Sequence, residues 1–331
     1  MSTASPAGYT KIKEIGSGSF GKALLVQDQE GRNFVLKAID ISRMDQKERR
    51  DAVNEVRVLS SLKHPYVVSY RESFLEGRTL CIIMDYADGG DLFNRIAKTR
   101  KAGQTFPESQ IVRWFTQASL ALKHIHERHV LHRDLKSQNL FLSSSGRLRI
   151  GDFGIARVLD STAAFAKTTI GTPYYLSPEI CQEKPYAWSS DVWAMGCILY
   201  EMASLRVPFD AANIRALVAK ITRGPTPALP SRYSPELQRL CGDLLQREEK
   251  KRPTSVEVLK YPVVQTEIRS MLKEEQQRRP PCEAPSQRHY GGGPPCDSAR
   301  GPGDSRTNSA RGSCHSEFSR EAAATPKHGG A

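Results

Sequence analysis

The chain has 331 residues, of which 39% are hydrophobic and 25% charged, with a formal net charge of +12. These are the proportions of a soluble globular protein. No run of about 18 apolar residues occurs, so we expect no membrane span, and the first residues lack the apolar core of a signal peptide. The basic residues are scattered and do not alternate with aromatic ones, which indicates a solvated basic surface rather than a nucleic-acid site. A basic groove for an anionic ligand or an acidic partner is also compatible with this charge.

The seven cysteines indicate a reducing compartment, the cytoplasm or nucleus. Their number is odd and no CxxC spacing occurs, so the sequence predicts neither a disulfide framework nor a zinc site. Cys81 and Cys197 lie in apolar runs, which is typical of small core residues.

The first part of the chain is predicted to be rich in strands. Short segments of β-forming residues occupy about 9–15, 22–28 and 33–39, and two more lie at about 67–74 and 79–84. Between them, about 46–62 is predicted to form a helix with one apolar face, made of Ala52, Val56, Leu59 and Leu62.

From residue 91 the pattern becomes helical, with helices predicted at about 91–100, 108–127, 189–204, 211–222 and 234–246. From 278 to 331 there is no Leu, Ile, Val, Met or Trp, while Gly, Pro and Ser abound. Such a segment cannot bury enough surface to offset the entropy of ordering it. We therefore divide the chain into an N-terminal extension (1–8), a folded domain (9–265), a short helical extension (266–279) and a disordered tail (280–331).

Gly16, Gly18 and Gly21 form a GxGxxG string, which alone is weak evidence because dinucleotide-binding folds use the same spacing. A dinucleotide fold needs a helix after the string, whereas the residues after Gly21 are predicted to form a strand. A strand–glycine loop–strand hairpin can instead fold over a triphosphate, because without a Cβ the backbone N–H groups come close.

Lys37 lies among apolar residues of the predicted strand 33–39, and Glu55 lies on the helix that follows. An isolated buried ammonium group is costly, so we expect Lys37 to have partners, which a phosphate and Glu55 would supply. The alternative is a strand-edge lysine in water.

The string HRDLKSQN runs from His132 to Asn139, and DFG begins at Asp152. Together with the glycine string and Lys37, these motifs resemble the signature set of the protein kinase superfamily, and Lys136 resembles its serine/threonine branch. The resemblance implies an α+β, bilobal kinase fold, with a small β-rich lobe (about 9–86) and a larger helical lobe (about 87–265). It also implies transfer of the γ-phosphoryl group of ATP.

The resemblance implies a role for each motif residue. Lys37, oriented by Glu55, would hold the α- and β-phosphates. Asp134 would accept the proton of the substrate hydroxyl, and Lys136 would steady the γ-phosphate. The metal ligands would be Asn139 and Asp152, which suit Mg²⁺, with Mn²⁺ as a substitute.

The residues implied to line the ATP site are Ile15, Gly16, Gly18, Gly21, Ala23, Val35, Lys37, Met84, Asp85, Ala87 and Phe141. Within this set Met84 would wall off the back of the adenine pocket. Asp85 and Ala87 would make main-chain hydrogen bonds to adenine.

Further landmarks concern stability and regulation. Glu179 and Arg252 resemble the ion pair that braces the larger lobe, and Asp191 resembles the carboxylate that holds the catalytic loop. The activation segment contains Thr168, Thr169 and Thr172. We expect Thr168 to be the activating phosphorylation site, with Thr169 second, and Arg133 to pair with the phosphate. Thr172 is implied to shape the substrate platform.

Longer strings, including IDISRM at 39–44 and GDFGIARVL at 151–159, are similar to the NIMA-related (Nek) kinases. Calmodulin-dependent and sterile-twenty-like kinases are disfavoured by these strings. The implied partners are protein substrates and an upstream kinase, or the chain itself in trans, with no coiled-coil assembly evident. The expected location is cytoplasmic, with nuclear, cytoskeletal or ciliary association implied by resemblance only. The alternative function is a catalytically weak scaffold that binds nucleotide and partners.

Overall fold

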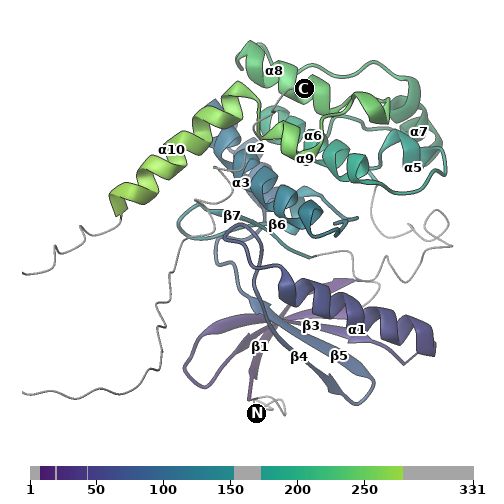
Figure 1. The fold of residues 1–331 in the computed structure, drawn as a ribbon, viewed down its shortest axis with the longest axis vertical. Helices are drawn as coiled ribbons and strands as arrows, with labels where there is room; N and C mark the ends of the chain where they lie inside the picture. The colour runs from purple at the N-terminus through teal and green to yellow at the C-terminus, as the bar shows by residue number, and fades with distance from the viewer. Residues whose placement is uncertain (1–7, 19–20, 43, 153–172, 279–331) are drawn as a thin grey trace, which may run out of the picture. The chain divides into compact units, whose positions relative to one another are not determined.

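The computed structural model describes residues 8–18, 21–42, 44–152 and 173–278, without the side chains of 47, 48, 51 and 53–55. By its contacts the chain divides into residues 1–273 and 274–331, and the second unit is described only over 274–278. The first unit contains an antiparallel sheet followed by a helical part, which confirms the predicted α+β bilobal fold (Figure 1).

The sheet has five strands in the order β1-β2-β3-β5-β4. They are β1 (Thr10–Gly18), β2 (Gly21–Gln27), β3 (Asn33–Asp40), β4 (Tyr70–Glu76) and β5 (Thr79–Asp85). Helix α1 (Gln46–Ser61) follows β3, and the predicted apolar face is confirmed because Ala52, Val56 and Leu59 are all buried.

The helical part is organised around two long buried helices, α3 (Glu108–Glu127) and α6 (Trp188–Ser204). Helix α6 is apolar on nearly all sides, which is typical of a helix surrounded by protein. A Cβ on Gly196 would lie 2.8 Å from the Cβ of Leu244, so this glycine allows α6 and α8 to approach closely.

The remaining elements surround these two helices. They are α2 (Leu92–Lys101), η1 (Ser137–Asn139), β6 (Leu140–Leu142), β7 (Leu148–Ile150), α5 (Pro178–Cys181), α7 (Ile214–Arg223), α8 (Pro235–Leu244), η2 (Glu249–Lys251), α9 (Ser255–Val258) and α10 (Pro262–Arg278).

Two predicted boundaries are wrong for identifiable reasons. The strand expected from residue 67 begins at Tyr70, because Val67 bridges Ile150 and the Val68 N–H donates to the Ile150 carbonyl at 2.8 Å. The helix expected from 211 begins at Ile214, because the Asn213 side chain accepts the Ala216 N–H at 2.9 Å and caps the helix.

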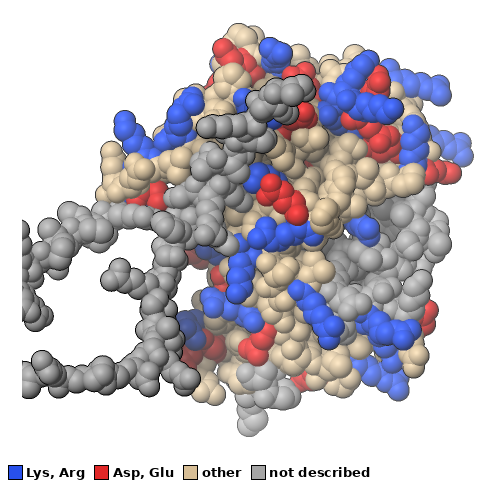
Figure 2. Space-filling view, in the orientation of Figure 1, with Lys and Arg blue, Asp and Glu red and all other residues tan. Residues whose placement is uncertain are grey.

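The surface and the cysteines agree with the composition. Lys and Arg side chains are interspersed with acidic and neutral ones on the face drawn in Figure 2. Cys81, Cys181, Cys197 and Cys241 carry free thiols, and Cys81 and Cys197 are buried as predicted. Over the described part of the chain, we find no helix with the length and apolar character needed to cross a membrane.

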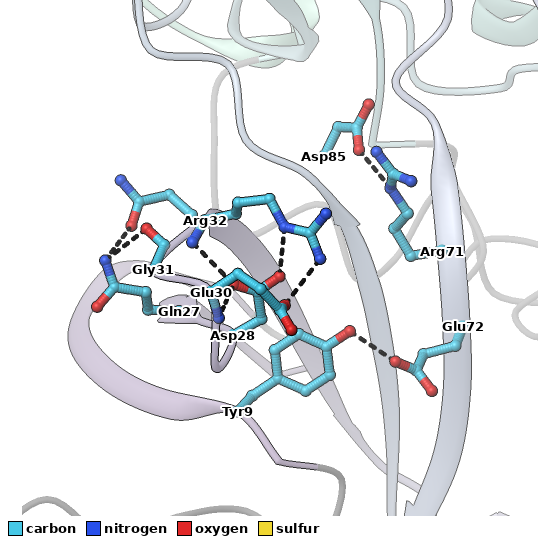
Figure 3. Close-up of polar contacts among 10 residues, drawn as sticks. Tyr9, Gln27, Asp28, Glu30, Gly31, Arg32, Arg71, Glu72 and Asp85 are labelled. Atoms are coloured by element: carbon cyan, nitrogen blue, oxygen red, sulfur yellow. Dashed lines mark hydrogen bonds and ion pairs between the residues drawn. The ribbon is translucent and has the colours of Figure 1, made fainter.

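Tyr9 joins the two outer strands of the sheet. Its ring packs at 80° and 5.8 Å against Phe34, in a core cluster that includes Val26 and Ile83. Its hydroxyl donates to Glu72 Oε1 of β4 at 2.6 Å (Figure 3). Tyr9 directly precedes β1, and β1 and β4 are the two edge strands of the sheet. This hydrogen bond therefore links the two edges of the sheet.

We expect Tyr9→Phe to lower the free energy of unfolding by about 1 kcal/mol at neutral pH, since one partly buried hydrogen bond is lost. Burial, and then Glu72, raise the pKa of Tyr9 from 10.0 to about 12. The folded state therefore holds this proton more tightly, and its contribution is present below pH 10 and lost as the pH rises to 12. Urea unfolding across this window should show a smaller decline for Tyr9→Phe than for wild type; equal declines would contradict the assignment.

Candidate active site

The glycine string forms a tight hairpin. Gly16 and Gly18 lie at the end of β1, and Gly18 pairs with Gly21 at the start of β2. Gly21 has a φ of +150°, and a Cβ there would lie 1.8 Å from the Ala38 carbonyl oxygen, so the position requires glycine. The antiparallel strand after the string matches the predicted hairpin and excludes the helix that a dinucleotide-binding fold would need.

Four side chains predicted to enclose ATP lie on one face of the sheet. Ala23 pairs with Lys37 in the β2–β3 ladder, and Val35 pairs with Met84 in the β3–β5 ladder. Paired residues share a face, as do residues two apart on one strand. Ile15, on β1, is 42% exposed, so the side chain of this predicted ATP contact is accessible to solvent.

A small recess lies behind Met84. Its walls come from both parts of the domain and consist of Lys37, Leu59, Val68, Tyr70, Met84, Gly151 and Asp152. A Cβ on Gly151 would come within 2.7 Å of Val68 Cγ2 and 3.0 Å of the Phe141 ring. The absence of a side chain at 151 therefore lets Phe141, a predicted ATP contact on β6, pack close to the main chain.

Asp85, the last residue of β5, holds the start of the segment that is expected to contact adenine. The Asp85 N–H donates to the Ser69 carbonyl at 2.9 Å, so an adenine hydrogen bond at Asp85 has to use its carbonyl oxygen. The Asp85 carboxylate lies 2.7 Å from Arg71 Nε (Figure 3) and 3.5 Å from Arg149 Nη1. Ala87 lies two residues further on and is partly buried. Neither arginine carries a sequence signal for this role, and the polar alternation of β4 marks Arg71 only as a surface residue.

The catalytic loop brings three predicted residues together. Asp134 Oδ2 lies 2.8 Å from Lys136 Nζ and accepts the Asn139 side-chain N–H at 2.9 Å. The same amide nitrogen donates to the Asp134 carbonyl at 2.7 Å. Asp134 is therefore held in one orientation beside a cation.

Asp191, fully buried in the first turn of α6, anchors this loop. Its carboxylate accepts the backbone N–H groups of His132 at 3.0 Å and Arg133 at 3.1 Å. It also contacts His126 Nε2 at 2.9 Å and the Tyr186 hydroxyl. Burial alone would raise the pKa of Asp191, but these contacts, His126 first, bring it below its ordinary value. Arg133 adopts a φ of +65°, a left-handed conformation that costs about 1 kcal/mol, and the Asp191 bond helps to hold it.

Lys37 forms an ion pair with Asp152 Oδ1, across 115 residues of sequence. Its side chain is only 22% exposed and β3 lies between β2 and β5, so the alternative of a strand-edge lysine in water is wrong. Glu55, the predicted partner, lies on α1, and its side chain is outside the described residues.

The donor set suits a hard divalent cation. Asp152 supplies a carboxylate, and Asn139 Oδ1 is available as a ligand because the amide nitrogen is committed to Asp134. No cluster of three or more His, Cys, Asp or Glu that could hold a metal occurs among the described residues. Two oxygen ligands completed by water and phosphate are typical of Mg²⁺. Asp152 also has a φ of +54°, and aspartate tolerates this conformation better than most residues.

The predicted Glu179–Arg252 pair is present and almost fully buried. Arg252 Nη1 donates to Glu179 Oε1 at 2.8 Å, and Arg252 Nη2 donates to Glu179 Oε2. The Arg252 side chain is 0% exposed and the Glu179 side chain is 1% exposed. Ser190 Oγ donates to the same carboxylate at 2.7 Å. Burial would raise the pKa of Glu179, but the Arg252 and Ser190 hydrogen bonds hold it below its usual range. Arg252 also lies over the ring of Trp193 at 5.3 Å, which ties the pair to α6.

The three regulatory threonines, Thr168, Thr169 and Thr172, lie outside the described residues.

Comparison with known proteins adds a family. A sequence model described as "Protein kinase domain" matches residues 9–264. Mouse serine/threonine-protein kinase Nek1 is 50% identical over 80% of this chain, mouse Nek4 is 42% identical over 81%, and human Nek5 is 45% identical over 81%. The matched regions span 22%, 34% and 38% of those relatives, respectively.

We expect Arg252→Ala to lower the free energy of unfolding by about 3–5 kcal/mol, because it leaves the Glu179 carboxylate buried without a cation. Arg239→Ala is the matched control. Arg239 is 82% exposed and lies 3.8 Å from Asp243, and such a surface pair contributes at most about 1 kcal/mol. Denaturant unfolding of both variants measures the difference. Equal losses in the free energy of unfolding would show that the buried pair contributes no more to stability than a surface pair.

Proposed function

Because the chain belongs to the protein kinase family, we propose that it transfers the γ-phosphoryl group of ATP to serine and threonine hydroxyls of protein substrates. Membership of this family implies the use of ATP, a divalent metal ion and protein substrates. The observation that carries the proposal is a single site in which Lys37, Asp134, Lys136, Asn139 and Asp152 converge from β3, the catalytic loop and the end of β7.

We assign the chemical work to particular groups. The Asp134 carboxylate is the acceptor for the proton of the substrate hydroxyl, and the contacts of its Oδ2 with Lys136 and Asn139 fix its direction before substrate arrives. Lys37 supplies a positive charge for phosphate oxygens, and in the structure Asp152 holds that charge in the site. We take Mg²⁺, with Mn²⁺ as a substitute, as the ion that Asn139 and Asp152 hold, where it neutralises phosphate charge.

No specific observation favours the alternative of a catalytically weak scaffold. The charged groups expected for phosphoryl transfer are present, and four of them form two ion pairs, Lys37 with Asp152 and Lys136 with Asp134. The relatives compared above are named serine/threonine-protein kinases.

We expect Asp134→Asn and Asp152→Ala each to lower phosphoryl transfer by at least about 100-fold, since one removes the proton acceptor and the other a metal ligand. The measurement is γ-phosphate transfer by the full chain to a degenerate serine/threonine peptide library, with Mg²⁺ and with Mn²⁺. Asp210→Asn, an exposed carboxylate whose side chain takes no part in the site, is the control. Turnover within tenfold of wild type in either site variant, at an unchanged melting temperature, would overturn these roles.

For regulation we propose that phosphorylation of Thr168 raises activity, with Thr169 as the second candidate. Arg133 directly precedes Asp134 and can pair bidentately with a phosphate, which would order the activation segment. The phosphate would come from an upstream kinase or from this chain in trans.

We therefore expect Thr168→Ala to lower activity several-fold and Arg133→Ala to blunt the difference between phosphorylated and unphosphorylated protein. Mass spectrometry across residues 160–175 defines the two states, and peptide kinetics compares them. Addition of Asp134→Asn chain as a substrate for the active chain tests transfer in trans. Unphosphorylated protein that is already as fast as the phosphorylated form would refute the switch.

A further inference from the structure

Glu201 is a buried acid that the proposed mechanism does not use. It lies on α6, is 3% exposed, and forms no ion pair with a Lys, Arg or His of the described residues. A buried carboxyl without a cation is costly unless hydrogen bonds satisfy it. Its partners therefore explain why the position is acceptable.

Two hydroxyl groups satisfy this carboxyl and also touch each other. Tyr175 OH contacts Glu201 Oε2 at 2.5 Å, and Ser137 Oγ contacts Glu201 Oε1 at 3.1 Å. The Ser137 and Tyr175 hydroxyl oxygens are 2.9 Å apart, and this contact closes a ring of three. The Ser137 N–H also points to the Tyr175 hydroxyl, at 3.4 Å.

Proton counting indicates how the ring is filled. Ser137 and Tyr175 bring one hydroxyl proton each, so with an ionised Glu201 one of the three contacts has no proton. Both hydroxyls donate to Glu201, since the Tyr175 hydroxyl donates to Oε2 and the Ser137 hydroxyl donates to Oε1. Burial raises the pKa of Glu201, whereas these two hydrogen bonds, and then the charge of Arg100 on α2, lower it.

The ring joins three functional segments. Ser137 follows Lys136 in the catalytic loop and begins η1, which ends at the metal-ligand candidate Asn139. Tyr175 lies in the segment 173–177, which joins Thr172, the residue implied to shape the substrate platform, to α5. Glu201 lies on α6, the helix whose first turn carries Asp191. Helix α6 therefore holds the catalytic loop at two points: Asp191 binds the backbone of the loop, and Glu201 binds the Ser137 side chain.

We propose that Ser137 is a positioning residue whose hydroxyl couples the segment 173–177, and with it the substrate platform, to the catalytic loop through Tyr175 and Glu201. The inference rests on the proposed kinase activity, because the coupling acts on the peptide substrate. It assigns no chemical step to Ser137. This role of Ser137 has no sequence signal, because its hydroxyl partners lie 38 and 64 residues away in the chain.

The test compares full-chain variants by steady-state kinetics with peptide and with ATP. For Ser137→Ala and for Tyr175→Phe we expect kcat/KM for peptide to fall about three- to tenfold, the effect of one hydrogen bond. The KM for ATP and the rate of peptide-independent ATP hydrolysis should stay within about twofold, because the ring does not touch the phosphate-binding atoms.

Ser119→Ala is the matched control, since Ser119 is a buried serine of α3 whose hydroxyl donates to the Phe115 carbonyl at 2.8 Å. It should lower stability without changing kcat/KM for peptide. If Ser137→Ala does not fold, Tyr175→Phe decides.

Peptide kinetics like those of Ser119→Ala, or an equal loss in ATP hydrolysis, would overturn the coupling while leaving the kinase function intact. Absence of transfer by the wild-type chain would overturn the proposed function, and the coupling with it.

Discussion

The site depends on one buried carboxylate, that of Asp191. The loop that carries Asp134 runs from α3 to η1, and an irregular segment of this kind has few hydrogen bonds of its own. It also includes a residue, Arg133, in a left-handed conformation. Asp191 supplies hydrogen bonds to the loop and also holds the Arg133 conformation, since its two carboxylate oxygens bind the consecutive backbone N–H groups of His132 and Arg133. A helix buried on nearly all sides keeps Asp191 in place, so the rigidity of the helical core passes directly to the proton acceptor.

The other half of the site is carried by the sheet, and three of the described contacts between the two halves are small. The Lys37–Asp152 pair crosses between them, as do the bridge from Val67 to Ile150 and the pair of Asp85 with Arg149. Each contact is polar or involves a single residue pair. Contacts of this kind can be exchanged for others at small cost, which suits a site that must admit a nucleotide and release it.

The parts of the molecule that could be predicted from the sequence are those with a local signal. The face of α1 and the strands around the glycine string follow from spacing alone, and the catalytic residues follow from dense motifs. Prediction failed where a distant residue decides the structure: Val67 bridges Ile150 of β7 and does not belong to β4. The sequence predicts that Lys37 has partners, but it does not indicate Asp152, which lies 115 residues away. The ring at Glu201 could not be predicted either, because a serine, a tyrosine and a glutamate carry no pattern until the fold brings them together.

Gly151 has a consequence for how this sequence can vary over evolutionary time. Its missing side chain is filled by Val68 from one lobe and Phe141 from the other, at distances that leave no room for a methyl group. A change to alanine would overpack the contact, whereas a smaller neighbour would relieve it. Positions 68, 141 and 151 should therefore co-vary among relatives, and drift at any one of them is limited by the other two.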